Sequence, residues 1–285
     1  MNKILLTGSN GFIGSHFFDN YSTVYDIHKF SFLKDDITKL DLETIDTVVH
    51  LSALVHRMGG ASAEEYEKIN VVQTLELAKK AKASGVKLFV FMSTIKVYGE
   101  ETEAVYDETS ECYPEDAYGK SKLKAERELQ KLESENFKIS IVRTPIVYGR
   151  GVKANINNLL NLVKKISILP FADIKNRRSM VYVGNLSHLL HEVIIQRKSG
   201  IFLASDDTPL STTQLIELIA DGLGKKVYLL KIPFFETLLK LLKPSFYKRL
   251  YCSLEVNNSA TKEKLNLKNS YTAEEGIILM TQGKK

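Results

Sequence analysis

The sequence predicts an α/β protein: a doubly wound parallel sheet with helices on both faces, followed by a smaller carboxy-terminal substrate domain. Two observations predict this fold class. Short β-rich runs alternate with longer helical patterns through the first half of the chain, and such alternation forms βαβ units with right-handed crossovers. After Gly149 the apolar runs become helical and less regular. We therefore expect domains at 1–150 and 151–285, with the segment 181–204 returning to the sheet.

The spacing of apolar residues places each element in order. Strands are expected at 4–7, 23–25, 30–33, 47–52, 87–92, 139–143 and 201–204, and helices at 12–21, 64–84 and 118–135. Gly85 ends the second of these helices. The amphipathic, basic stretch 234–243 is expected to be a core helix of the second domain, ended by Pro244. A place on a membrane surface is the other interpretation of that stretch.

Composition narrows the classes of function. The chain has 285 residues, of which 44% are hydrophobic and 26% charged, as in an ordinary globular protein. Its net charge of +5 is spread along the sequence, so neither nucleic acid nor stable membrane insertion is implied. Two cysteines, Cys112 and Cys252, exclude a disulfide scaffold and a four-cysteine metal site. No metal site is expected, and the lack of a signal peptide or membrane span favours the cytoplasm.

A glycine-rich loop, TGSNGFIG at 7–14, follows the first expected strand and opens the first helix. One glycine permits the tight turn, one lets the backbone approach a pyrophosphate, and one lets helix and strand pack closely. Free N–H groups at the start of the helix then face the diphosphate. A glycine-rich turn without a ligand is the alternative. The order strand, loop, helix predicts a Rossmann fold that binds a dinucleotide through Gly8, Gly11, Phe12, Ile13 and Gly14.

The GxxGxxG spacing of this loop resembles the short-chain dehydrogenase/reductase superfamily, in particular its extended branch. In that family an acid at the end of the second strand binds the adenosine ribose, and Asp26 is the candidate. A carboxylate there favours NAD by repelling a 2′-phosphate, whereas His28 and Lys29 could favour NADP. We expect NAD. The resemblance also implies adenine contacts from Asp36 and Ile37, and a cofactor-lining turn at Leu51, Ser52 and Ala53.

Tyr118 and Lys122 form a Tyr-x-x-x-Lys pair on the third expected helix. Residues four apart share one helix face, and a nearby ammonium favours the phenolate of a tyrosine, which makes Tyr118 a usable acid and base. The alternative interpretation is that Tyr118 and Lys122 lie on a solvated helix face and have no catalytic role. The segment FMSTIKVYG at 91–99 resembles the family's strand-end Ser/Thr segment. This implies that Ser93 lines the cofactor, that Thr94 binds the reacting substrate oxygen, and that Lys122 also holds the nicotinamide ribose.

Two later segments resemble substrate elements of nucleotide-sugar epimerases, dehydratases and ketoreductases. RTPIVYG at 143–149 resembles their nicotinamide-side turn, which places Pro145 beside the cofactor. RRSMVYV at 177–183 resembles the segment whose arginine holds the nucleotide diphosphate, and Arg178 takes that role by position. Asn158 is expected to bind substrate, and Arg249 is a candidate second phosphate ligand. A solvated basic turn and a helix-surface residue are the alternatives for Arg178 and Asn158.

Departures from the family pattern narrow the reaction. Ile95 and Lys96 stand where a sugar 4,6-dehydratase carries an Asp-Glu pair, so dehydration is not expected. SALVH at 52–56 resembles bacterial enzymes of surface-polysaccharide sugar synthesis, and His56 could border the substrate. Two reactions at C4 of a nucleotide-linked, UDP-type hexose or N-acetylhexosamine remain. Chain length and the short connection between the second and third strands narrowly favour 4-ketoreduction over 4-epimerisation.

Two further expectations rest on the family resemblance. A cofactor sensor without catalysis is the competing class of function, but such a protein would not need to keep both Tyr118 and Lys122. Family members often dimerise through helices of the sheet domain, so a homodimer is expected by analogy.

Overall fold

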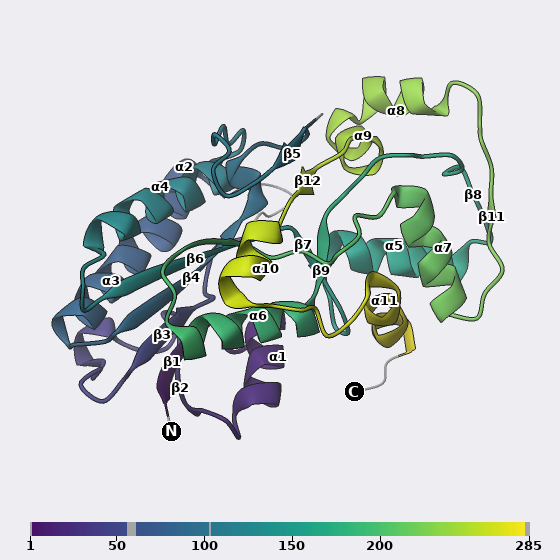
Figure 1. Ribbon diagram of the computed structural model, residues 1–285. Coiled ribbons are helices and arrows are strands. Elements are labelled where there is room, and N and C mark those ends of the chain that lie inside the picture. Colours follow the sequence, from purple (N-terminus) through teal and green to yellow (C-terminus); the bar gives the residue numbers. More distant parts are fainter. Residues whose placement is uncertain (1, 56–60, 103, 283–285) are drawn as a thin grey trace.

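The computed structural model describes residues 2–55, 61–102 and 104–282. Within these residues, six parallel strands form the main sheet in the order β10-β6-β4-β3-β1-β2 (Figure 1). They are β1 (Lys3–Thr7), β2 (Asp26–Phe30), β3 (Thr47–His50), β4 (Leu88–Thr94), β6 (Lys138–Thr144) and β10 (Gly200–Leu203). The chain order reverses at β1, which has β2 on one side and β3 on the other. The predicted doubly wound α/β fold is confirmed, and its switch point lies at the carboxyl end of β1.

Helices cover both faces of this sheet (Figure 1). Because side chains alternate along a strand, Ile4 and Leu6 of β1 face one way and Leu5 the other. The first face packs against α1 (Phe12–Tyr21) and α6 (Val183–Gln196). The opposite face packs against α3 (Gln73–Ala83) and α4 (Ala117–Leu132). Burial on both faces explains the continuous apolar runs of the central strands.

The helix expected at 64–84 contains a change of helical geometry. It begins as α2 (Ala63–Tyr66), capped by Ser62, passes through a π-helical turn at Glu67–Val72, and continues as α3. Asn70 lies in the π-helical turn. Its side-chain amide accepts a hydrogen bond from Leu54 N (2.8 Å) and donates to Leu54 O (3.0 Å) and Ser121 Oγ (3.0 Å). Asn70 therefore joins the loop after β3 to α4.

One edge of the sheet differs from the prediction. A single strand, β2, replaces the two strands expected at 23–25 and 30–33. It pairs along the whole of β1, with Asp26 opposite Lys3 and Phe30 opposite Thr7. The chain then turns at once, since Lys34 N and Asp35 N both donate to Ser31 O. It continues into a short 3₁₀ turn, η1, at Ile37–Lys39.

The second half of the chain builds a smaller layer beside the sheet. β7 (Ile146–Tyr148) pairs in parallel with β9 (Met180–Tyr182), and a second core forms around them. It is enclosed by α5 (Ala154–Lys165), α7 (Thr212–Gly222) and α11 (Ala273–Gln282). Between these elements the chain returns to the sheet domain as α6 and β10. The remaining elements are β5 (Val105–Tyr106), β8 (Ile168–Leu169), β11 (Tyr228–Leu229), α8 (Phe235–Leu242), α9 (Pro244–Tyr251), β12 (Glu255–Val256) and α10 (Ser259–Leu265).

Helix α8 lies at the upper margin of the smaller domain (Figure 1). Each of its residues keeps part of its surface exposed, so the prediction of a core helix at 234–243 is wrong. The physical reason is that α8 packs mainly on α9, with the Phe235 ring reaching back to Phe171 (6.2 Å between centroids). Within the described residues, every helix is too short or too polar to cross a bilayer.

Candidate active site

The glycine loop closes tightly over the end of β1. Gly8 has a φ of +71°, and a Cβ at Gly14 would lie 2.2 Å from Gly8 O, so neither position tolerates a side chain. Gly11 is the N-cap residue of α1, and the helix begins at Phe12. Having no side chain, Gly11 leaves the first N–H groups of the helix accessible to an anion. The loop therefore fits a dinucleotide diphosphate, as its spacing predicts. Ile13 packs on the core beneath it.

The turn Leu51–Ala53 lies against this loop. A Cβ at Gly8 would come within 2.8 Å of Ser52 N, and Ser52 N donates to Thr7 Oγ1 (3.2 Å). His50 is buried between Thr7 Oγ1 (2.8 Å) and Thr74 Oγ1 (2.9 Å). Burial lowers the pKa of His50 to about 3, so its ring stays neutral at physiological pH. The predicted cofactor-lining turn and glycine loop are thus brought together at the switch point.

Asp26 does not lie where the sequence predicts it. It begins β2 instead of ending it, so it sits at the amino edge of the sheet, opposite Lys3. Four residues, or about 13 Å of strand, separate it from Phe30 at the carboxyl edge. Asp26 is exposed and pairs with His28 (3.4 Å). The prediction that Asp26 ends the second strand is wrong, and with it the case for a ribose contact there.

Other carboxylates follow β2 more closely. Asp35 Oδ2 accepts a hydrogen bond from Ser31 N (2.7 Å), directly after the carboxyl end of the strand. Asp36 accepts from the backbone N–H and hydroxyl of Thr38, which lowers the pKa of its carboxyl group. Ile37, the first residue of η1, is half-buried and packs on the core. The adenine contacts of Asp36 and Ile37 stay predictions.

The three predicted catalytic residues lie at the carboxyl end of β4 and on the first turns of α4, which packs beside that strand. Thr94 ends that strand and is buried. The start of α4 packs on the turn that follows it, since a Cβ at Gly119 would lie 2.9 Å from Lys96 O. Lys122 is buried, and its Nζ donates to Met92 O of β4 (2.8 Å). Tyr118 lies one helical turn before Lys122.

Burial changes the acid–base properties of this pair in opposite directions. It lowers the pKa of Lys122 to about 7, against the nearby charge of Glu126, which raises it. It raises the pKa of Tyr118, and the negative charge of Asp116 adds to that effect. The two groups lie one turn apart on α4, on the same face of the helix. An ammonium at Lys122 is therefore the feature that would favour a phenolate at Tyr118.

A buried ion pair lies one turn beyond Lys122. The Glu126 carboxylate binds the Arg143 guanidinium, with 2.6 Å between Oε2 and Nη2, and also accepts the Ser93 hydroxyl. Arg143 donates in addition to Tyr98 OH (2.7 Å). The Ser93 hydroxyl, predicted to line the cofactor, thus serves this network. Sequence reasoning missed Glu126, although its position four residues after Lys122 was the available signal.

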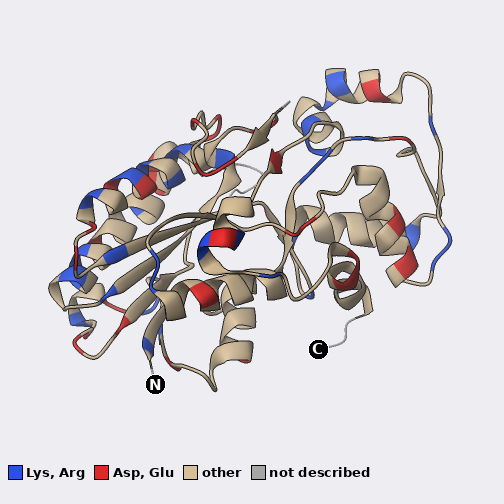
Figure 2. Cartoon of the chain, viewed as in Figure 1, with Lys and Arg blue, Asp and Glu red and all other residues tan. Residues whose placement is uncertain are grey.

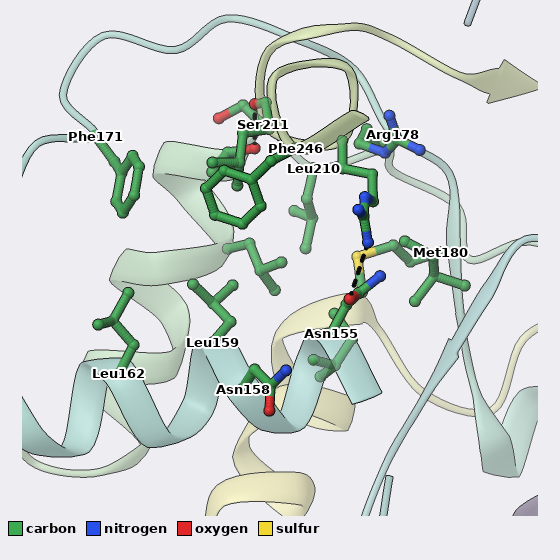
Figure 3. Close-up of a pocket in the computed structure, with 16 residues that line it drawn as sticks. Asn155, Asn158, Leu159, Leu162, Phe171, Arg178, Met180, Leu210, Ser211 and Phe246 are labelled. Carbon is green, nitrogen blue, oxygen red and sulfur yellow. Dashed lines mark hydrogen bonds between the residues drawn. The ribbon is translucent and has the colours of Figure 1, made fainter. Parts of the chain in front are cut away.

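The residues predicted to bind substrate line a second region, a cavity of about 450 Å³ between α5, α7 and α9 (Figure 3). Its lining includes the predicted Asn158 and Arg178, together with Arg249. Arg178 Nη1 donates to Cys252 O (2.9 Å), and Arg249 Nη1 to Asn155 Oδ1 (3.3 Å). Most of the remaining wall is apolar: Leu159, Leu162, Phe171, Leu210, Leu215 and Phe246.

Strands β7 and β9 connect the cavity to the sheet domain, which carries the predicted cofactor site. Ile146 and Met180 are paired neighbours on these strands, and both line the cavity. Pro145, predicted to lie beside the cofactor, is buried directly before Ile146. Arg177 points elsewhere and pairs with Glu255 (2.6 Å). His56 lies outside the described residues.

Comparisons with known proteins agree with this geometry. The sequence model of the NAD dependent epimerase/dehydratase family matches residues 4–202. A UDP-glucose 4-epimerase from Vibrio cholerae is 36% identical over 96% of this chain and 93% of its own length. An N-acetyl-alpha-D-glucosaminyl-diphospho-ditrans,octacis-undecaprenol 4-epimerase from Escherichia coli O157:H7 is 27% identical over 81% of this chain and 76% of its own.

A solved structure shows the same fold. UDP-glucuronic acid 4-epimerase from Bacillus cereus, crystallised with NAD, superposes with a TM-score of 0.79 at 21% identity. The superposition covers 98% of this chain and 96% of that one. The glycine loop, the Tyr-x-x-x-Lys pair and the family match over 4–202 lead to one conclusion: the chain belongs to the NAD dependent epimerase/dehydratase family, whose members are NAD-dependent enzymes.

Proposed function

We propose that this protein is a 4-epimerase of a UDP-linked hexose or N-acetylhexosamine. The observation that carries the proposal is the near end-to-end similarity to the Vibrio cholerae UDP-glucose 4-epimerase. The sequence's narrow preference for 4-ketoreduction is not supported, and the alternative reaction fits the relatives better. Chain length is a property of the whole chain, and the β2–β3 connection lies near one edge of the sheet. The predicted reacting groups lie at the end of the central strand β4. Those features therefore discriminate poorly between the two reactions.

In the proposed reaction Tyr118 is the catalytic acid and base. Its phenolate takes the proton of the sugar 4-hydroxyl, and Thr94 Oγ1 hydrogen-bonds the same oxygen. NAD, when bound, supplies a hydride acceptor and donor for C4. Tyr118 returns its proton to the oxygen after the sugar has presented its other face. No net oxidation results, since the hydride removed from C4 is restored to it.

Lys122 positions and stabilises the phenolate. Its pKa of about 7 leaves the ammonium and amine forms close in free energy at neutral pH. Glu126 favours the ammonium form by its negative charge. The hydrogen bond from Lys122 Nζ to Met92 O holds the ammonium at the end of β4, two residues before Thr94. Lys122 can therefore carry the positive charge that the Tyr118 phenolate requires.

The cavity suits the nucleotide end of the substrate. Arg178 and Arg249 offer guanidinium groups to the oxygens of a diphosphate. Apolar walls at Leu159 and Phe171 suit the faces of a pyrimidine base (Figure 3). Ile146 leads from this cavity toward Pro145 and the sheet, which would direct the sugar to Tyr118.

The test is cofactor stoichiometry. Purified protein is incubated with UDP-glucose, UDP-galactose, UDP-N-acetylglucosamine and their 4-keto forms, each with and without NADH or NADPH. We expect interconversion of 4-epimers with no consumption of added reduced cofactor. One reduced cofactor oxidised per product would overturn the proposal in favour of ketoreduction. NAD binding without turnover of any sugar would overturn it in favour of a sensor.

A further inference from the structure

A cluster of exposed apolar side chains covers the outer side of α8 and its flanks. We call it the α8–α9 face. Phe234, Leu241 and Leu242 are the most exposed, at 85%, 75% and 71%. Single exposed apolar residues are ordinary, but a contiguous cluster marks an interaction surface. The face consists of Leu230, Ile232, Phe234, Leu238, Leu241, Leu242 and Phe246.

The apolar side chains of α8 that are most exposed lie on one face of the helix. Leu238, Leu241 and Leu242 follow the i, i+3, i+4 spacing of one helix face, and Phe234 precedes the helix as its N-cap residue. Phe235 and Leu239, on the neighbouring stripe, are the better covered residues of α8. Phe234 also adopts a φ of +62°, an unfavourable conformation for a bulky residue. Because the Phe234 ring is exposed, it makes few contacts within the fold that could offset this strain. This favours a role of the ring in binding.

The charged residues near the α8–α9 face indicate what kind of partner it binds. Residues 230–250 contain five basic residues and one acidic residue, Glu236. Two of the five pair with carboxylates elsewhere in the chain, which leaves Lys240, Lys243 and Arg249 against Glu236. Lys240 lies on α8 and Lys243 follows it, so both border the apolar side chains; Figure 2 shows both blue and red on α8. A second copy of this face would bring the same small excess of positive charge and no complementary one. Apolar and aromatic side chains bordered by lysines are instead typical of a helix that lies in the surface of an anionic bilayer.

The face continues into the cavity wall. Phe246, at one end of the face, also lines the cavity, and Arg249 and Leu250 of α9 follow it there. We propose that the α8–α9 face docks on the surface of an anionic lipid bilayer and holds the α9 wall of the cavity against it. This binding is independent of the reaction, so it can be tested without turnover.

The experiment is flotation of the full chain with lipid vesicles. We expect binding to vesicles of phosphatidylcholine mixed with phosphatidylglycerol, weaker binding to phosphatidylcholine alone, and release at high salt. The triple variant Phe234→Ser/Leu241→Ser/Leu242→Ser should lower the partition coefficient by roughly tenfold or more. Lys240→Gln and Lys243→Gln should each lower it by about fivefold, only with the anionic lipid.

A matched control uses an exposed apolar–basic pair far from α8. Leu33 is 96% exposed and precedes Lys34 on the loop after β2. Leu33→Ser/Lys34→Gln should leave flotation unchanged. Circular dichroism confirms that each variant is folded, and the lysine variants keep the test valid if the triple variant is not. Flotation that is absent, equal on both vesicles, or equal for wild type and variants would overturn the proposal. So would dimerisation in sedimentation that the triple variant abolishes.

Discussion

The candidate site has two parts whose charged side chains have different partners: the sheet side, around the end of β4 and α4, and the cavity side, between α5, α7 and α9. On the sheet side, Lys122, Glu126 and Arg143 expose no more than 3% of their surface, and Glu126 neutralises Arg143 directly. On the cavity side, Arg178 donates to a backbone carbonyl and Arg249 to a side-chain amide and a backbone carbonyl. Neutral acceptors leave most of a guanidinium's charge available to an anion. Under the proposed function, the first side keeps a proton donor in place and the second receives a negatively charged ligand.

The largest effect is expected from removing the proposed acid and base. Tyr118→Phe should reduce kcat by about 10²–10⁴-fold, because no phenolate then takes the 4-hydroxyl proton. NAD binding should persist. The measurement is the rate of UDP-glucose and UDP-galactose interconversion, with Tyr113→Phe, at an exposed tyrosine, as the control. A Tyr118→Phe variant with more than a tenth of wild-type activity would contradict the assignment.

Breaking the charge balance of the sheet side should cost stability. Glu126→Gln leaves Arg143 buried without its carboxylate, so the free energy of unfolding should fall by about 3–5 kcal/mol. Chemical denaturation measures this. Glu128, two residues on along α4, pairs with Lys131 at the surface, and Glu128→Gln should be indistinguishable from wild type. Equal stability of the two variants would show that the buried pair is not what holds this side together.

The cavity side should respond in substrate affinity instead. Arg178→Ala removes a guanidinium that we assign to the diphosphate, so KM for the UDP-sugar should rise by about 10–100-fold with a smaller change in kcat. Its neighbour Arg177 pairs with Glu255 outside the cavity and offers a matched control. If Arg177→Ala raises KM as much as Arg178→Ala does, the assignment of the cavity fails.

Acid should destabilise the sheet side through His50. Its pKa of about 3 in the folded protein lies below the ordinary 6.5, so between these values the unfolded chain binds more protons. The contribution of His50 to stability therefore falls as pH falls through this window. From pH 7 to pH 5 the expected loss is about 2 kcal/mol. Denaturation curves at both pH values measure it. The loss should be smaller in His50→Gln, and an equal loss in that variant would assign it to other groups.

Local sequence patterns predict the sheet side well. The glycine loop, α4 and the central strands depend on residues near one another in the chain, where apolar spacing and glycine positions determine conformation. Thr94 ends β4, and Tyr118 and Lys122 lie one turn apart on α4, which packs beside that strand. The pairing of Glu126 with Arg143 joins residues 17 apart in the chain, and no periodicity indicates it.

The predictions that fail concern surfaces and edges. The prediction for Asp26 depends on where the second strand lies, and that strand begins three residues later than expected. Composition alone does not distinguish the start of a strand from its end. The stretch 234–243 has the apolar periodicity of a buried helix, yet periodicity identifies an apolar face without saying what covers it. The cavity between α5, α7 and α9 depends on segments that approach only in the folded chain.

The π-helical turn at Glu67–Val72 has an evolutionary consequence. Its extra residue sets the rotation at which Asn70 faces both Leu54 and Ser121. Deleting one residue of this stretch would restore the regular α-helical pitch and remove the widened turn that presents Asn70 to both partners. The segment can therefore drift in amino-acid identity at its exposed positions, such as Val72, but its length is constrained, and natural variants of this protein should show substitutions there without gaps.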